Sequence, residues 1–255
     1  METRDKYSTI ELYDAFISVN DSIAQEVLEL ISRLEEAERN HIQYYPAITN
    51  AKCLGEEASE YGERTLRTLI AKYSKGEDIE IIRSYLQEVT DAFIQNQKYK
   101  GGFSYDHYIW ALSIVIILDV ENQTERVFKS IPLSNDYLIN YLISSQISSL
   151  EIPACEKFYF ELPYRSTKEV IDLAGQGKKE EAVKRLKKYL TREWYRGNAE
   201  LGWHNDHKSK FNLHFGYWSF ESGALVKILG LDDSSLKGLQ YYPYDMVHWN
   251  DKKTE

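Results

Sequence analysis

The sequence predicts an all-α protein made of two helical modules, each a helix hairpin followed by a buried apolar helix. Apolar residues recur at helical spacing through most of the chain, which is the primary signal for amphipathic helices. With 5 prolines and 13 glycines in 255 residues, the chain has few turn residues for an all-β protein. The same order of elements recurs in the two halves and suggests an internal duplication.

Three helices are expected to open the chain, each with one apolar face and a recognisable cap or break at its ends. Their expected limits are, in order, Asp21 (or a start near Ser8) to Pro46, residues 50–73 up to Gly76, and Asp78 to the break at Lys100-Gly101-Gly102.

A helix of almost only apolar residues follows at about residues 104–120. It should be central to the first module, because a helix that is apolar all round is usually buried. Two shorter helices are expected at about residues 121–129 and 135–148, the second capped by Ser134.

The stretch 149–164 is the best module boundary. It contains two prolines, loses the helical period and lies where the charge balance changes. We therefore expect an N-terminal module over residues 1–150 and a C-terminal module over 151–255. In the second module, the tetrapeptide from Ser166 to Glu169 fits a capping box, and a further helix is expected over residues 178–195.

Charge is spread unevenly between the modules. Residues 1–150 hold 14 Lys and Arg against 24 Asp and Glu, a balance of −10, whereas residues 151–255 hold 17 against 16, a balance of +1. An acidic surface repels nucleic acid and favours a basic protein partner. Plain solubility is the alternative explanation for such a surface.

The acidic residues of the first module are the candidate partner-binding site. Glu56, Glu60 and Glu63 fall at i, i+4 and i+7 on one helical face, where like charges are mildly destabilising. A helix that tolerates this repulsion favours use of the face in binding, and a solvated face is the alternative. The full candidate set is Glu56, Glu57, Glu60, Glu63, Glu77, Asp78 and Glu80.

A dense aromatic block containing Tyr217, Trp218, Phe220 and Glu221 begins a helix in the second module. Among these rings Glu221 should be desolvated, which raises a carboxyl pKa and can produce a general acid or base. His214 and His248 are its candidate partners in catalysis. A structural glutamate bonded to buried hydroxyl or indole groups is the more frequent outcome, so no catalytic residue is assigned.

Other chemistry has little support in the sequence. His204, His207 and His214 are of metal-ligand type, but they lie in a polar loop segment and no metal or other cofactor is expected. Phosphate-binding, dinucleotide-binding and hydrolase motifs are missing. The spacing of the two cysteines fits neither a disulfide framework nor a metal site. No signal peptide or membrane-spanning segment is visible in the sequence, so we expect a cytoplasmic protein. Twenty tyrosines should give a packing or binding surface rich in aromatic rings.

The aromatic block also carries a resemblance to a known family. Tyr217 to Ala224, followed by Lys227 to Asp233 and then Tyr241-Tyr242-Pro243-Tyr244-Asp245, resembles the C-terminal module of the PoNi immunity proteins. The first half, with Tyr105-Asp106-His107-Tyr108 before its apolar helix, is similar to the N-terminal module of that family.

The resemblance implies a bacterial cytoplasmic protein that protects its producer or kin from a secreted antibacterial DNase toxin of the PoNe type. It would act by stoichiometric binding, without chemistry of its own. Two alternatives stay open: a small all-α enzyme using Glu221 with a nearby histidine, and a helical scaffold for another partner. A homodimer is also left open.

Overall fold

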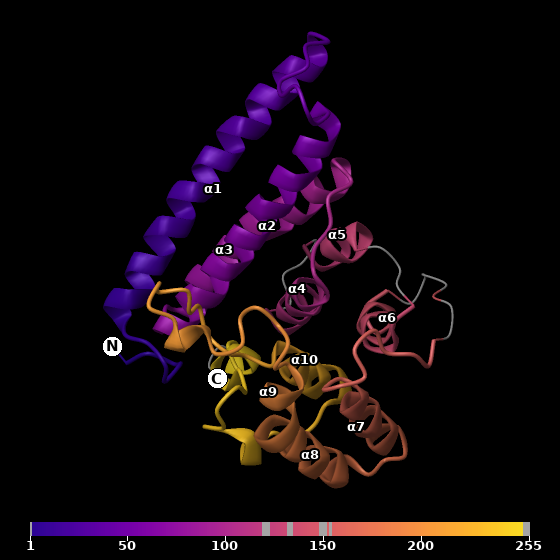
Figure 1. The fold of residues 1–255 in the computed structure, drawn as a ribbon. Helices are drawn as coiled ribbons and strands as arrows, with labels where there is room; N and C mark the ends of the chain where they lie inside the picture. Colours follow the sequence, from indigo (N-terminus) through magenta and orange to yellow (C-terminus); the bar gives the residue numbers. More distant parts are fainter. Residues whose placement is uncertain (1, 119–122, 132–134, 148–151, 153–154, 252–255) are drawn as a thin grey trace. The chain divides into compact units, whose positions relative to one another are not determined.

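The computed structural model describes residues 2–118, 123–131, 135–147, 152 and 155–251. Within these ranges every regular element is a helix, and no strand is present (Figure 1). The all-α prediction is therefore confirmed. No helix in the same ranges is both long enough and apolar enough to cross a bilayer.

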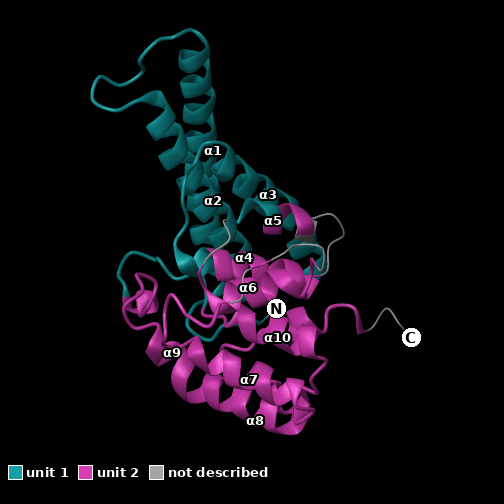
Figure 2. Cartoon of the chain, turned by 90° about the vertical axis from the view of Figure 1, so that its right-hand side faces the viewer, with its two compact units in different colours: residues 1–107, 129–131, 209–216 teal, residues 108–128, 132–208, 217–255 magenta. Residues whose placement is uncertain are grey.

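The chain divides into two compact units that interleave along the sequence (Figure 2). Unit 1 contains residues 1–107, 129–131 and 209–216, and unit 2 contains residues 108–128, 132–208 and 217–255. These units are defined by spatial contact, so the expected division of the sequence between residues 150 and 151 stays a prediction.

Unit 1 is built on three long helices: α1 (Ile10–Arg39), α2 (Asn50–Lys75) and α3 (Ile79–Lys98). Helix α2 packs against both α1 and α3, as Figure 1 shows. Apolar side chains at helical spacing meet between them and exclude water, which is the main stabilising contribution. Part of this core consists of Ala24, Val27, Ile31, Leu34, Cys53, Leu54, Tyr61 and Ala92.

Helix α1 begins earlier than its first predicted cap. Thr9 is the N-cap, and its side chain accepts a hydrogen bond from the Leu12 amide, so the alternative start near Ser8 is right and Asp21 lies inside the helix. The end predicted at Pro46 is also wrong, because α1 ends at Arg39 and His41 takes a left-handed φ of 56°.

The turn between α2 and α3 follows the prediction closely. Gly76 ends α2 with a φ of 103°, a conformation that a side chain would disfavour. The Asp78 carboxylate accepts a hydrogen bond from the Glu80 amide at 2.8 Å and caps α3.

Residues 209–216 close unit 1 from far along the sequence. The Ser74 hydroxyl donates to the Phe215 carbonyl at 2.8 Å, and the Phe215 ring lies 6.0 Å from that of Phe16. Buried His214 contacts buried Asp5 at 2.8 Å, and Tyr13 donates to the same carboxylate at 2.6 Å. This segment therefore joins the start of α1 to the end of α2.

Unit 2 contains shorter helices, and α4 and α5 begin or end in unit 1. They are α4 (Tyr105–Leu118), α5 (Gln123–Ser130), α6 (Tyr137–Ser144), α7 (Arg165–Gly175), α8 (Lys179–Lys188), α9 (Trp194–Gly197), α10 (Phe220–Leu229) and α11 (Tyr244–Val247). Helix α4 is the predicted apolar helix, and its described residues from Ile109 to Leu118 are all buried. Each half therefore contains a hairpin, α2–α3 or α7–α8, and a buried helix after it, while the duplication itself stays a prediction.

Three local predictions in this region need correction. The capping box at Ser166 is wrong, because α7 starts one residue earlier and the Ser166 hydroxyl donates to Glu193 at 2.6 Å instead. The single helix expected over residues 178–195 is interrupted by a π-helical turn at Tyr189–Glu193. Helix α6 is capped by Asp136, whose carboxylate accepts from the Ile139 amide; Ser134 lies outside the described residues.

Much of the aromatic content packs inside unit 2 rather than on a binding surface. Trp194 stacks near Trp203 with ring centres 5.6 Å apart, and Tyr195 stacks on Tyr241 at 5.3 Å. The Tyr217 ring lies 5.2 Å from Tyr195 and 5.7 Å from Trp203. Such contacts add stability beyond the burial of area, so most of these rings serve the fold.

Candidate protein-interaction site

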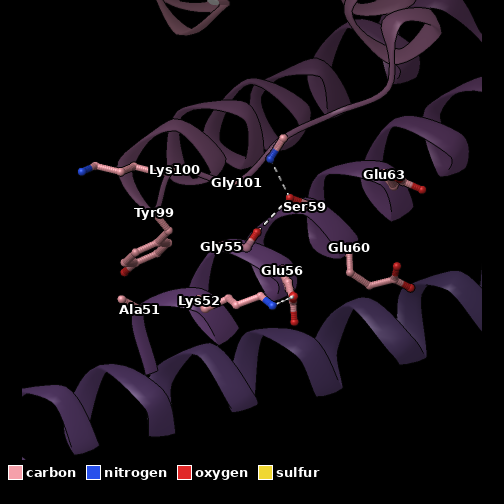
Figure 3. A pocket seen from close by; sticks show the side chains of 11 residues that line it. Ala51, Lys52, Gly55, Glu56, Ser59, Glu60, Glu63, Tyr99, Lys100 and Gly101 are labelled. Carbon is pink, nitrogen blue, oxygen red and sulfur yellow. Dashed lines mark hydrogen bonds and ion pairs between the residues drawn. The ribbon is translucent and has the colours of Figure 1, made fainter. Parts of the chain in front are cut away.

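A groove in unit 1 collects three of the predicted acidic residues. It runs along the first half of α2 beside the turn that follows α3, with a volume of about 650 Å³ (Figure 3). Glu56, Glu60 and Glu63 line it along α2, and Tyr99 and Lys100 line it from the turn. Their 3.6-residue spacing places these carboxylates on one face, as the sequence predicts. We call this the α2 groove.

Close backbone packing shapes the floor of the α2 groove. A Cβ atom on Gly101 would lie 2.5 Å from the Gly55 carbonyl oxygen, so only glycine allows the turn to approach α2. The Ser59 hydroxyl donates to the Gly55 carbonyl at 2.8 Å and accepts from the Gly102 amide at 3.0 Å (Figure 3). The loop after α3 is thereby fixed to the helix that carries the glutamates.

Each carboxylate of the α2 groove has a basic neighbour on the same helix. Lys52 lies 3.7 Å from Glu56, Arg64 lies 2.5 Å from Glu60, and Arg67 lies 3.0 Å from Glu63. Such i,i+4 pairs offset the like-charge repulsion expected from the glutamate spacing alone. These pairs are partly exposed and therefore contribute little to stability, and the exposed Lys52 can give way to a partner's cation.

Glu57 lies on a different side of α2. It lines a second groove, of about 410 Å³, with residues of α1 and of the α1–α2 loop, among them Glu26, Tyr44 and Tyr45. Burial and the nearby carboxylates of Glu60 and Glu56 raise the pKa of Glu57 above its usual range. The four glutamates of α2 therefore belong to two surfaces.

Glu77, Asp78 and Glu80 have structural partners at the α2–α3 turn. Lys75 contacts Glu77 at 2.6 Å, and Asp78 caps α3. Glu80 pairs with Arg83 at 3.1 Å. These three residues do not line the α2 groove, so the seven predicted acidic residues do not share one groove.

Glu221 is fully buried at the start of α10. Its Oε1 accepts hydrogen bonds from the Tyr189 hydroxyl at 2.7 Å and the Ser219 hydroxyl at 2.6 Å. Burial raises the pKa of this carboxyl, against the lowering effect of the two hydroxyl bonds. A carboxyl sealed from solvent cannot exchange protons with a substrate, so the geometry supports the structural role. Tyr217, Trp218 and Phe220 around it are also buried.

The histidines have partners other than Glu221. His214 contacts Asp5, and His248 contacts Asp233 at 2.9 Å. His207 contacts the Tyr217 hydroxyl at 2.7 Å, and that hydroxyl donates to Asp206 at 2.6 Å. Among the described residues, no group of three or more His, Cys, Asp or Glu is arranged to hold a metal ion.

The sequence reasoning missed the loop between α1 and α2. Ile42, Tyr44 and Tyr45 are its exposed large side chains, and the latter two line the second groove with Glu57. The signal was available, because a Tyr-Tyr-Pro run in a short helix–helix linker has no helical face to bury.

Comparison with known proteins identifies the family. Residues 4–129 match the family model described as "PoNe immunity protein (PoNi), N-terminal", and residues 134–246 match "PoNe immunity proteins (PoNi), C-terminal". The chain also matches a solved structure titled "The Crystal Structure of Protein PA2201 from Pseudomonas aeruginosa". That match has 17% identity and a TM-score of 0.67, over 100% of this chain and 92% of that chain. At this identity it shows a shared fold alone. No curated protein matches the sequence. Because the two family models together span most of the chain, it belongs to the PoNe immunity protein (PoNi) family.

Proposed function

We propose that this protein binds and neutralises a cognate antibacterial DNase toxin of the PoNe type in the bacterial cytoplasm. Membership of the PoNi family over residues 4–129 and 134–246 is the observation that carries the proposal. The protein protects its producer during interbacterial competition by occupying the toxin, and it needs no cofactor and no chemistry of its own. The buried, hydroxyl-bonded Glu221 is consistent with this mode of action.

The α2 groove is proposed as one part of the toxin contact. A DNase must present cationic side chains to the phosphates of DNA, and those cations are complementary to the carboxylates of Glu56, Glu60 and Glu63. Charge complementarity of this kind mainly accelerates association and depends on salt. The exposed Lys52 side chain can turn away when a partner's cation replaces it, whereas Arg64 is also held by its hydrogen bond to the Asn20 side chain at 3.0 Å.

Charge reversal tests this contact. We expect the triple variant Glu56→Lys, Glu60→Lys and Glu63→Lys to bind its cognate PoNe-type DNase domain at least about tenfold more weakly at low salt. The α2 groove is proposed to carry association, so the loss should lie mainly in the association rate, measured by surface plasmon resonance. Cells that express the toxin domain should grow with the wild-type protein and be killed with the variant.

A matched control separates this effect from a change in total charge. Unit 2 offers three exposed glutamates for this control, Glu156, Glu161 and Glu200. Like the groove glutamates, two of them have a basic neighbour: Glu156 pairs with Lys168, and Glu161 pairs with Arg165. Reversing these three should leave binding unchanged. If both triple variants bind as the wild type does at low salt, the α2 groove is not a toxin contact.

A further inference from the structure

The loop between α1 and α2 carries large side chains that the fold does not bury. The exposed fractions are 59% for Ile42, 37% for Tyr44 and 40% for Tyr45. The two tyrosine rings meet edge to face, with their centres 4.8 Å apart. Apolar and aromatic groups left together on a surface commonly mark an interaction site.

This loop is nevertheless held in one conformation by its own hydrogen bonds. The Asn50 side chain accepts from the Tyr44 amide at 2.9 Å and donates to the Ile42 carbonyl at 2.7 Å. The side-chain amide of Gln43 donates through Nε2 to the backbone carbonyls of Tyr45 and Ile48. A loop fixed in this way loses little conformational freedom on binding, which favours affinity.

Carboxylates line the same groove as the Tyr44 and Tyr45 rings. Glu26 of α1 and Glu57 of α2 line it with Tyr44 and Tyr45, and neither carboxylate pairs with a cation among the described residues. By contrast, Glu29 in the same groove pairs with Arg33 at 3.4 Å. The groove therefore combines aromatic faces with two uncompensated negative charges, a combination that suits a cationic side chain.

We propose that this hairpin-loop surface, made of Ile42, Tyr44, Tyr45, Glu26 and Glu57, receives a lysine- or arginine-bearing segment of the toxin. The cationic head pairs with the two carboxylates, and its stem or guanidinium plane packs on the tyrosine rings. This inference rests on the proposed function and adds a second contact to the α2 groove.

A second copy of this chain is a poorer occupant. Two-fold pairing through this surface would bring Glu26 and Glu57 toward the same residues of the partner, which is unfavourable for uncompensated charges. The apolar part is also small, three side chains, against the 1,200–2,000 Å² that stable protein interfaces of standard size bury, as a rough guide.

The test measures binding of a purified, cognate PoNe-type DNase domain by calorimetry at two salt concentrations. We expect Tyr44→Ala with Tyr45→Ala to weaken binding by roughly 30-fold or more, the effect of losing an aromatic hot spot. Glu26→Gln with Glu57→Gln preserves side-chain shape and should weaken binding with a shallower dependence on salt. The tyrosine variant should keep the wild-type unfolding temperature, because both rings are exposed. The glutamine variant should unfold at the same or a higher temperature, because it removes a Glu57 charge that burial and nearby carboxylates disfavour.

Unit 2 offers a matched control. Tyr159 and Phe160 form another exposed aromatic pair, with ring centres 5.0 Å apart in an edge-to-face arrangement. Tyr159→Ala with Phe160→Ala should leave binding unchanged. An equal loss in both aromatic variants would overturn the inference, since the effect would not be specific to the hairpin-loop surface.

The outcomes separate this inference from the proposed function. If the wild type binds the toxin domain and Tyr44→Ala with Tyr45→Ala binds equally well, the inference is wrong and the proposed function stands. If the wild type neither binds that domain nor protects cells from it, the proposed function fails and the inference fails with it. If sedimentation shows a wild-type dimer that the tyrosine variant abolishes, the occupant is a second copy and the inference is overturned.

Discussion

Replacing Glu221 separates a structural carboxyl from a catalytic one. The side chain is fully buried, and its Oε1 accepts from the hydroxyls of Tyr189 and Ser219. Truncation to alanine opens a cavity and removes two buried hydrogen bonds. Large-to-small core changes cost about 2–5 kcal/mol and each of the two hydrogen bonds about 1 kcal/mol, so we expect Glu221→Ala to lose about 4–7 kcal/mol. In a chain of this size that lowers the unfolding temperature by roughly 8–28 °C.

Glu221→Gln gives the sharper result, because it retains an oxygen for both hydroxyls and carries no charge at any pH. Burial raises the pKa of Glu221 above the model-compound value of 4.5. Below pH 4.5 the carboxyl is protonated in both the folded and the unfolded chain. Above that pH only the unfolded chain releases the proton, so the wild type loses stability until the folded pKa is reached. The glutamine variant has no such loss.

Urea unfolding followed by circular dichroism measures the difference. The free energy of unfolding of the wild type minus that of Glu221→Gln should decrease as the pH rises above 4.5, because other titrating groups cancel in the comparison. A difference that does not change with pH would refute a raised pKa for the buried Glu221 carboxyl. A Glu221→Gln protein that keeps its stability but no longer protects cells would instead support the enzyme alternative.

Two further predictions concern buried aspartates. Asp5→Asn should cost about 1–3 kcal/mol, the effect of disrupting buried hydrogen bonds, because it removes the carboxylate that lies 2.8 Å from His214. Burial alone would raise the pKa of Asp5, but the bonds from His214 and Tyr13 lower it below 3.8. Protonating this carboxyl in acid therefore removes stability from the folded wild type. In acid titrations, the free energy of unfolding of the wild type should fall more steeply below pH 3.8 than that of Asp5→Asn. Asp136→Ala removes the carboxylate that accepts from the Ile139 and Tyr159 backbone amides, both at 2.8 Å. We expect it to lower the free energy of unfolding in urea by about 1–3 kcal/mol. Asn135→Ala, which alters the exposed residue next to it, is the control.

Structural features that depend on neighbouring residues could be predicted from the sequence, whereas contacts between residues far apart in the sequence could not. Gly76 and Asp78 define the α2–α3 turn through contacts within a few residues, so their sequence pattern was sufficient. The Ser166 capping box failed because Glu193, 27 residues later, accepts from that hydroxyl in the folded chain. Asp5 and His214 are 209 residues apart, and no periodicity could join them.

The acidic site shows the same limit. Spacing correctly placed Glu56, Glu60 and Glu63 on one face of α2. The spacing of the glutamates did not reveal that Arg64 and Arg67 compensate part of their charge. Each arginine follows its glutamate, Glu60 or Glu63, by four residues, so the signal was present in the sequence. The separation of Glu57 from this group depends on where α1 packs, which only the tertiary structure gives.

The closing segment 209–216 has a consequence for biosynthesis. Unit 1 is interrupted after residue 107 and receives this last part about a hundred residues later. At a translation rate of roughly 5–20 residues per second, the three long helices wait about 5–20 seconds on the ribosome before His214 and Phe215 emerge. During that interval Asp5 lacks its histidine and Phe16 lacks the Phe215 ring. A nascent chain or a fragment that stops at residue 150 is therefore an incomplete form of unit 1, because residues 209–216 are missing from it.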